Sequence, residues 1–147
     1  CGFDYLLPFE HSIATYGITL GHLTRLAEEI QQSGRYQYIV VDCSPEFTQE
    51  KSVLMSRCST VLLLVGQDRY TCARIDSLLR DINIRDTDKF QFVCNRYRAD
   101  EENYLKQALM GRMNIVEYIP FLPAHVLASV ASLGAAEEIM RLAYRLI

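Results

Sequence analysis

The 147-residue sequence has no apolar run near the roughly 20 residues that a membrane-spanning helix needs, and it does not open with a basic, apolar leader of the secretory kind. Its net charge of −3 gives no general attraction to nucleic acid or to anionic lipid. We therefore expect a cytoplasmic protein with no transmembrane segment and no nucleic-acid partner. Peripheral contact with a membrane stays open.

Metal-binding and redox patterns are missing as well. The five cysteines are odd in number and show no C-x-x-C spacing, and the three histidines are dispersed. We interpret the cysteines as reduced, mostly buried thiols and assign the histidines no catalytic role. The sequence also contains no G-x-S-x-G, H-E-x-x-H or G-x-G-x-x-G motif. Several common enzyme signatures are therefore absent.

Apolar runs that alternate with helical patterns are the main feature present. Half of the residues are hydrophobic and 22% are charged, so we expect one ordered domain over residues 1–147. Short apolar runs predict strands over 3–8, 38–41, 61–65, 90–94 and 115–119. Segments with apolar residues at helical spacing, bounded by residues that end helices, predict helices over 18–31, 47–56, 71–83, 101–110, 124–132 and 135–146. This order predicts an α/β fold with a doubly wound, mainly parallel sheet and helices on both faces.

The central strands are apolar on both faces, which is typical of parallel strands covered on both sides. We accordingly predict that six of their side chains are almost fully buried: Val40, Val41, Leu63, Leu64, Phe92 and Val93.

Asp42 is the first candidate for chemistry, because it ends the apolar run that begins at Tyr36. Open α/β sheets bind ligands at the carboxyl ends of their strands. Magnesium commonly takes one carboxylate there beside a nucleotide phosphate. An aspartate after a strand is also often only a helix cap or a turn residue, so this alternative stays open.

Four segments together resemble the MinD/ParA family of ATPases. They are Tyr-x-Tyr-Ile-Val-Val-Asp-Cys-Ser-Pro at 36–45, Val-Leu-Leu-Leu-Val at 61–65, Phe-Val-Cys-Asn-Arg-Tyr at 92–97 and Tyr-Ile-Pro at 118–120. The Asn-Arg-Tyr ending is most similar to the CpaE/TadZ branch, which works in pilus assembly and polar localisation. The resemblance implies a P-loop NTPase-like fold, ATP with Mg²⁺, and nucleotide-dependent dimers that bind partners or membranes.

Site residues follow from this resemblance position by position. Asp42 resembles the Walker B aspartate that holds the magnesium, and 43–46 would sense the γ-phosphate. Asn95 resembles the adenine-facing residue, since an amide offers a donor and an acceptor together. Arg96 would stack its guanidinium beside the base, and Phe121 would cover it. Asn-Arg after a strand is otherwise often only a turn.

Departures from the family pattern weaken the predicted site. The glycine-rich phosphate loop G-K-G-G-x-G-K-[ST] is absent from the sequence, although its amides and lysine do most of the phosphate binding. Glu46 and Leu122 also differ from the residues that the family often has there. We therefore expect the carboxyl portion of an ATPase domain, with hydrolysis in the full-length parent and none by this chain alone.

The resemblance implies a role in the spatial positioning or assembly of a pilus or secretion machine. The implied partners are a second copy or a protein of that apparatus, at the inner face of the membrane. A catalytically silent interaction module of the same fold remains an alternative. So does a bacterial tyrosine-kinase relative, because Tyr97 and Tyr104 lie near acidic residues, although the chain ends with only one tyrosine, Tyr144.

Overall fold

The computed structural model describes residues 4–7, 10, 13–81, 89–105, 115–122 and 136–146. The chain divides into two compact units, Cys1–Cys58 and Ser59–Ile147. The single domain over residues 1–147 stays a prediction. Among the described residues, no helix is both long and apolar enough to cross a membrane.

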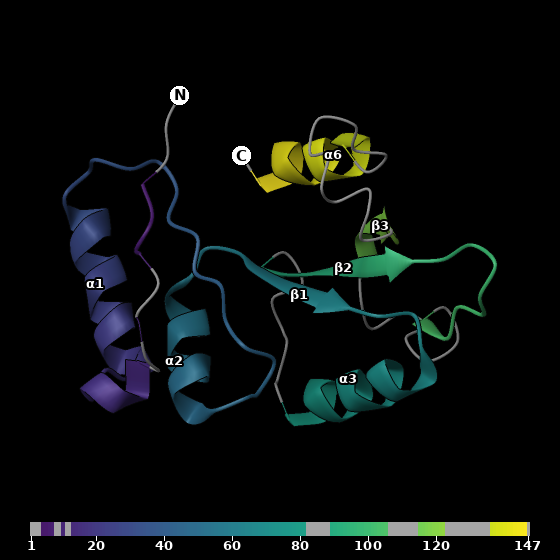
Figure 1. Ribbon diagram of the computed structural model, residues 1–147, viewed down its shortest axis with the longest axis horizontal. Coiled ribbons are helices and arrows are strands. Elements are labelled where there is room, and N and C mark those ends of the chain that lie inside the picture. Colours follow the sequence, from purple (N-terminus) through teal and green to yellow (C-terminus); the bar gives the residue numbers. More distant parts are fainter. Residues whose placement is uncertain are drawn as a thin grey trace. The chain divides into compact units, whose positions relative to one another are not determined.

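The first unit contains a short 3₁₀ helix, η1 (Ile13–Tyr16), and two α-helices, α1 (Leu20–Gln32) and α2 (Gln49–Arg57) (Figure 1). Gly34 follows the end of α1 and has φ +64°. Glycine suits this position because a residue without a Cβ adopts the left-handed conformation easily. The apolar face predicted for the first helix is half-buried, so both its position and its face are confirmed. The two helices pack together, with Leu54 and Met55 of α2 buried.

Two predicted strands of this unit are wrong. Residues 4–7 and 38–41 have no regular secondary structure. Val40 is 91% exposed and Val41 is also exposed, so their predicted burial is wrong as well. An apolar run becomes a strand only where another strand pairs with its backbone groups. No neighbouring strand pairs with 38–41 among the residues that the structure describes.

The second unit is built on a parallel three-stranded sheet in the order β1 (Val61–Val65), β2 (Phe90–Tyr97) and β3 (Ile115–Pro120). Helices α3 (Arg69–Asp81) and α6 (Ala136–Leu146) lie on opposite sides of the sheet (Figure 1). The structure thus confirms the parallel α/β class and the predicted strands over 61–65, 90–94 and 115–119. The helix predicted over 101–110 begins too early, because 101–104 are not helical and only residue 105 is described as helix. The helix predicted over 124–132 lies outside the described residues.

The core of this unit lies between the sheet and α3. Its buried members are Val65, Cys72, Ile75, Phe92, Cys94 and Leu105. Phe92 is 2% exposed and Val93 is fully buried, which confirms two of the six burial predictions. Leu63 is only half-buried against the core. Leu64 is 64% exposed, which contradicts its prediction. It projects from the face of β1 opposite to Leu63, because successive side chains of a strand alternate between faces, and β1 is the outer strand of the sheet as described.

None of the four cysteines that the structure describes, Cys43, Cys58, Cys72 and Cys94, forms a disulfide. Burial raises the pKa of Cys94 to about 11. It also raises the pKa of Cys72, with a smaller contribution from the charge of Asp68. Two of the four described thiols are buried, and Cys43 is exposed.

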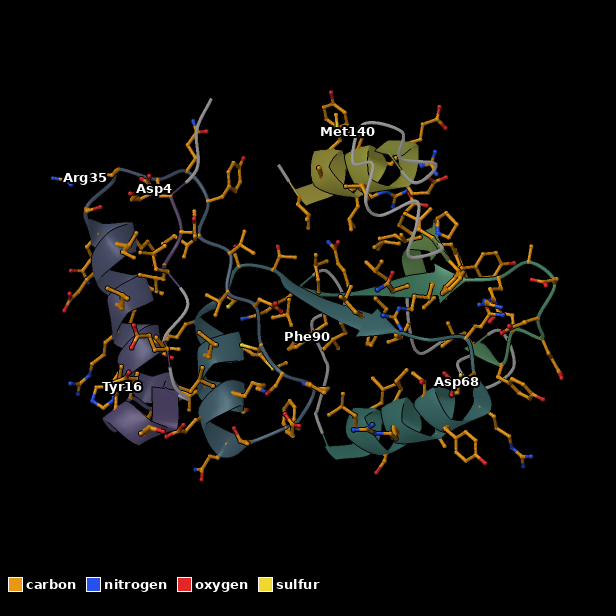
Figure 2. The ribbon with its side chains drawn as sticks, viewed as in Figure 1. Asp4, Tyr16, Arg35, Asp68, Phe90 and Met140 are labelled. Atoms are coloured by element: carbon orange, nitrogen blue, oxygen red, sulfur yellow. The ribbon has the colours of Figure 1, made fainter. Side chains whose placement is uncertain are left out.

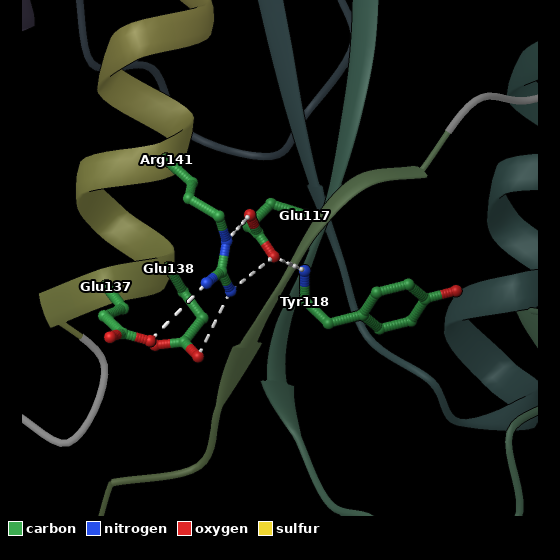
Figure 3. A network of polar contacts seen from close by, with 5 residues as sticks. All are labelled: Glu117, Tyr118, Glu137, Glu138 and Arg141. Carbon is green, nitrogen blue, oxygen red and sulfur yellow. Dashed lines mark hydrogen bonds and ion pairs between the residues drawn. The ribbon is translucent and has the colours of Figure 1, made fainter.

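A polar network attaches α6 to β3 (Figure 3). Arg141 of α6 donates from Nε to Oε2 of Glu117 at 3.0 Å, and its Nη2 lies 3.3 Å from Oε1 of Glu138. Glu117 also accepts from the backbone N–H of Tyr118 at 3.2 Å. The hydrogen bond from Arg141 lowers the pKa of the Glu117 carboxyl, against the opposing effect of burial. The network therefore holds the helix on this side of the sheet through ionised groups.

Candidate functional site

The carboxyl ends of the three parallel strands lie at one edge of the second unit. Gly66, Gln67 and Asp68 follow β1, Asn95 lies near the end of β2, and Phe121 follows β3. Open parallel sheets bind ligands at this edge, where loops and helix N-termini present polar groups. We therefore treat this edge as the candidate site of the second unit.

Asp68 caps the helix that leaves this edge, α3 (Figure 2). Its Oδ1 accepts from the Thr71 N–H at 2.9 Å, and its Oδ2 accepts from the Thr71 hydroxyl at 2.6 Å. These hydrogen bonds from Thr71 lower the pKa of the Asp68 carboxyl. A Cβ on Gly66 would lie 2.8 Å from Asp68 Oδ2, so only glycine leaves this cap undisturbed. The carboxylate is thus engaged in a structural role.

Gln67 joins the loop after β1 to the loop after β2. Its Oε1 accepts from the Arg98 N–H at 2.7 Å, and its Nε2 donates to the Arg98 carbonyl at 3.0 Å. Its own carbonyl accepts from the Tyr104 N–H at 3.0 Å. The residue is 5% exposed, so these bonds satisfy an amide that would be costly to bury without partners. Sequence reasoning missed Gln67, because its partners lie more than 30 positions further along the chain.

Asn95 and Arg96 occupy an irregular end of β2. The pairing of β2 with β3 shifts register between Cys94 and Tyr97, and Arg96 has φ 57°, in the left-handed region. Asn95 is half-buried, and its Oδ1 accepts from the Arg96 N–H at 2.9 Å. This hydrogen bond uses one of the two lone pairs that an adenine-facing amide oxygen would offer. The irregular end of β2 was not predicted from the sequence.

Phe121 is contacted by Arg98, two positions beyond the arginine singled out from the sequence. The Arg98 Cζ lies 4.0 Å from the centre of the Phe121 ring. Phe121 is 38% exposed, and its N–H donates to the Tyr97 carbonyl at 2.9 Å. Arg98 is also paired with Glu101 at 3.2 Å. A guanidinium on an aromatic ring is a flat, cationic surface of a kind that binds planar rings.

Asp42 belongs to the first unit, in an exposed stretch without regular structure. The loop that follows it is held by Lys51 of α2, which is 9% exposed. The Lys51 ammonium donates to the Ser44 carbonyl at 2.6 Å, to the Ser44 hydroxyl at 3.2 Å and to the carbonyl of Glu46. This loop thus has a fixed internal support, while Asp42 itself is open to solvent. Nothing in the sequence pattern had marked Lys51.

Metal-binding geometry is limited on this chain. No group of three or more His, Cys, Asp or Glu side chains that could hold an ion is found within the described ranges. A magnesium that takes most of its ligands from water and phosphate needs only one or two protein carboxylates. The sequence has no glycine-rich loop to hold a triphosphate, so the residues present do not fit that part of ATP.

A cleft of about 350 Å³ lies in the first unit, lined by residues before α1 and by α1 itself, among them Leu6, Tyr16, His22 and Leu26. Most of its lining is apolar. The Nδ1 of His22 accepts from the Thr19 N–H at 3.1 Å and so helps to begin the helix. This cleft shows no chemistry that points to a ligand.

Comparison with known proteins gives a fold but no family. No protein-family model matches the chain, and no curated protein matches it either. Two solved structures from Aquifex aeolicus are similar: the MinD cell division protein, with TM-score 0.67 and 20% identity, and the MinC:MinD cell division protein complex, with TM-score 0.64 and 21% identity. Each match covers 88% of this chain and 60–61% of the matched chain. The chain therefore has the fold of MinD and spans about three fifths of its length.

Proposed function

We propose that the chain is part of a MinD/ParA-type ATPase domain that binds a nucleotide at the carboxyl edge of its parallel sheet. The observation that carries the proposal is the likeness of fold to two MinD structures over 88% of the chain. The four segments that resemble the family in sequence support it independently.

On this proposal the nucleotide is ATP and the metal is Mg²⁺. Asp42 of the first unit is the proposed ligand of the metal, and Asn95, Arg96 and Phe121 of the second unit are the proposed contacts of the base. The residues at the end of β2 and after β3 suit a purine, because an amide and flat side chains can bind its edge and its faces. Since the triphosphate finds no fitting loop on this chain, hydrolysis belongs to the full-length parent.

The cellular role that we propose is that of the CpaE/TadZ branch, in which such a domain positions or assembles a pilus or secretion machine. The partner is a second copy or a protein of that machine, at the inner face of the membrane. The matched MinD structure in complex with MinC supports a protein partner for this fold.

A catalytically silent interaction module is the second candidate. The observation that favours it is the exposure of Asp42 and of the apolar residues before it, outside any strand. A metal ligand that works in catalysis is normally held by packed neighbours and by hydrogen bonds to its own oxygens. The two candidates differ in whether Mg²⁺ alters nucleotide binding through Asp42.

Titration of the chain with ATP, with and without Mg²⁺, separates them. We expect ATP to shift the NMR resonances of Asn95 and Phe121, and Mg²⁺ to add an effect at Asp42 that Asp42→Asn removes. Glu29→Gln is the control, because Glu29 is also an exposed carboxylate and lies on α1, apart from the proposed base contacts. A normal Mg²⁺ effect in Asp42→Asn would contradict the metal assignment. An absence of any ATP response favours the silent module.

Hydrolysis is measured on the same samples. We expect no magnesium-dependent release of phosphate by this chain. Release that Asp42→Ala abolishes would show that the chain is an enzyme on its own.

A further inference from the structure

The side chain of Gln67 forms a pair of hydrogen bonds with one backbone residue, as the backbone of a neighbouring strand would. Both polar atoms of its amide bind the backbone of one residue, Arg98, at 2.7 and 3.0 Å. The same Nε2 lies 3.3 Å from the carbonyl oxygen of Glu101 and 3.4 Å from that of Glu102. With the Tyr104 N–H on its carbonyl, this buried residue fixes the segment 98–104 from both ends.

Because the segment 98–104 is fixed, the backbone position from which the Arg98 side chain extends is fixed as well. Phe121 is held separately, through its N–H on the Tyr97 carbonyl. Tyr97 in turn packs against Tyr118 of β3, with ring centres 5.1 Å apart and planes at 69°. Both backbones are therefore anchored, and they hold the Arg98 Cζ 4.0 Å from the centre of the Phe121 ring. This contact is formed before any ligand binds.

The stacked pair lies where a planar ligand can reach it. The Arg98 side chain is 42% exposed, and Phe121 also remains partly open to solvent. Arg96 has no such arrangement, because its left-handed backbone follows the register shift and no ring contact involves it among the described residues. Arg98 is thus the better candidate for a stacking guanidinium.

We propose that Gln67 is a positioning residue for nucleotide binding: it holds Arg98 on Phe121, and this stacked pair takes the planar base. The inference rests on the proposed function and refines it by replacing Arg96 with Arg98 beside the base. A base stacked on such a surface gains about tenfold in affinity.

Gln67→Glu tests the positioning at almost constant size. The introduced carboxylate keeps an acceptor for the Arg98 N–H but loses the donor that faces the carbonyls of Arg98, Glu101 and Glu102. At neutral pH the introduced carboxylate should repel these three carbonyl oxygens. When acid protonates the introduced carboxyl, a donor returns, and the contact should form again.

The readouts are the NMR shift of the Arg98 Nε–H, which the Phe121 ring current moves upfield, and the affinity for adenosine. In the natural chain we expect adenosine to change this shift and base-free tripolyphosphate to leave it unchanged. In Gln67→Glu we expect the ring-current shift to disappear at pH 7.5, with about tenfold weaker adenosine binding, and both to recover toward pH 5. Gln37→Glu, an exposed position in the first unit, controls for the added charge.

Arg98→Lys provides a second test that leaves the Gln67 contacts in place. It keeps the charge and removes the planar face, so adenosine binding should weaken about tenfold. Arg74→Lys on the exposed side of α3 is the matched control and should bind as the natural chain does.

The inference is wrong if Gln67→Glu keeps the ring-current shift, if acid does not restore it, or if adenosine binds either Gln67→Glu or Arg98→Lys as tightly as the natural chain. The proposed function fails separately. In that case neither adenosine nor ATP shifts any resonance of the natural chain at Asn95, Arg98 or Phe121.

Discussion

Two apolar runs of similar composition have opposite fates in this molecule. Val61–Val65 forms β1 and pairs with β2, whereas 38–41 has no regular structure, is exposed and pairs with no strand that the structure describes. Both runs are uncharged and rich in β-branched or aliphatic residues. The difference shows that residues with high strand propensity form a strand only where a neighbouring strand pairs with their backbone. The strand propensity of a residue type largely reflects how well its side chain packs and is buried in a sheet.

The largest expected effect separates the two runs by energy. Phe92→Ala should lower the free energy of unfolding by about 3–5 kcal/mol, since it empties a fully enclosed site in the sheet. Val40→Ala should change it by less than about 0.5 kcal/mol. Urea unfolding measures both. A cost for Val40→Ala close to that for Phe92→Ala would mean that 38–41 is buried in solution.

Lys51 tests what holds the loop after the exposed run. Lys51→Met removes three hydrogen bonds and leaves the carbonyls of Ser44 and Glu46 without this donor, so we expect a loss of about 1–3 kcal/mol. Arg57→Met on the same helix is the control, because its ion pair with Glu28 at 3.6 Å is exposed and weak. Equal losses in both variants would contradict the support assigned to Lys51.

The outer edge of β1 tests whether a second copy completes the sheet. In the described sheet β1 has β2 on one side only, and Leu64 projects into solvent. Natural edge strands are often protected by charge. Leu64→Lys should weaken self-association about tenfold in sedimentation, without loss of stability. Tyr70→Lys on α3 is the exposed control. A natural chain that stays monomeric at high concentration would remove the case for pairing at this edge.

The α6 network gives a pH dependence with a defined sign. The pKa of Glu117 is lowered by the Arg141 hydrogen bond, so its folded value lies below its unfolded one. Its contribution to stability is therefore present above the unfolded pKa and is lost as pH falls through the folded pKa. Glu117→Gln should cost about 1 kcal/mol at pH 7 and flatten the acid limb of the stability curve. Glu137→Gln should do neither, because that side chain is 89% exposed. An unchanged acid limb in Glu117→Gln would assign the pH dependence to other carboxyls.

The smallest effect concerns the irregular end of β2. Arg96→Gly should raise stability by up to about 1 kcal/mol, since glycine adopts φ 57° without the Cβ penalty that arginine meets there. The same change in a helix, Arg74→Gly, should lower it by about 1 kcal/mol. Thermal unfolding measures the two. Destabilisation by Arg96→Gly would show that the arginine side chain makes contacts worth more than the strain.

Sequence patterns predicted the elements of the second unit well, because each of its three strands is a short apolar run next to a clear turn. They failed at 38–41, where the pattern was equally good and the pairing partner was missing. They also did not single out Arg98, whose guanidinium lies on the Phe121 ring in the structure. The register shift before Tyr97 and the bonds from Gln67 to Arg98 decide this position, and both depend on pairings between distant residues. Local periodicity carries no information about such pairings.

The buried thiols allow local unfolding of the second unit to be measured in the natural chain. At neutral pH almost all of Cys94 is in the unreactive thiol form, because its pKa is raised to about 11, and Cys72 is shielded beside it in the same core. Cys43 is exposed, so we expect an alkylating reagent to reach it in the folded state. The slow labelling of Cys72 and Cys94 then reports how often their surroundings open. An oxidant would likewise reach the first unit long before it reached the sheet.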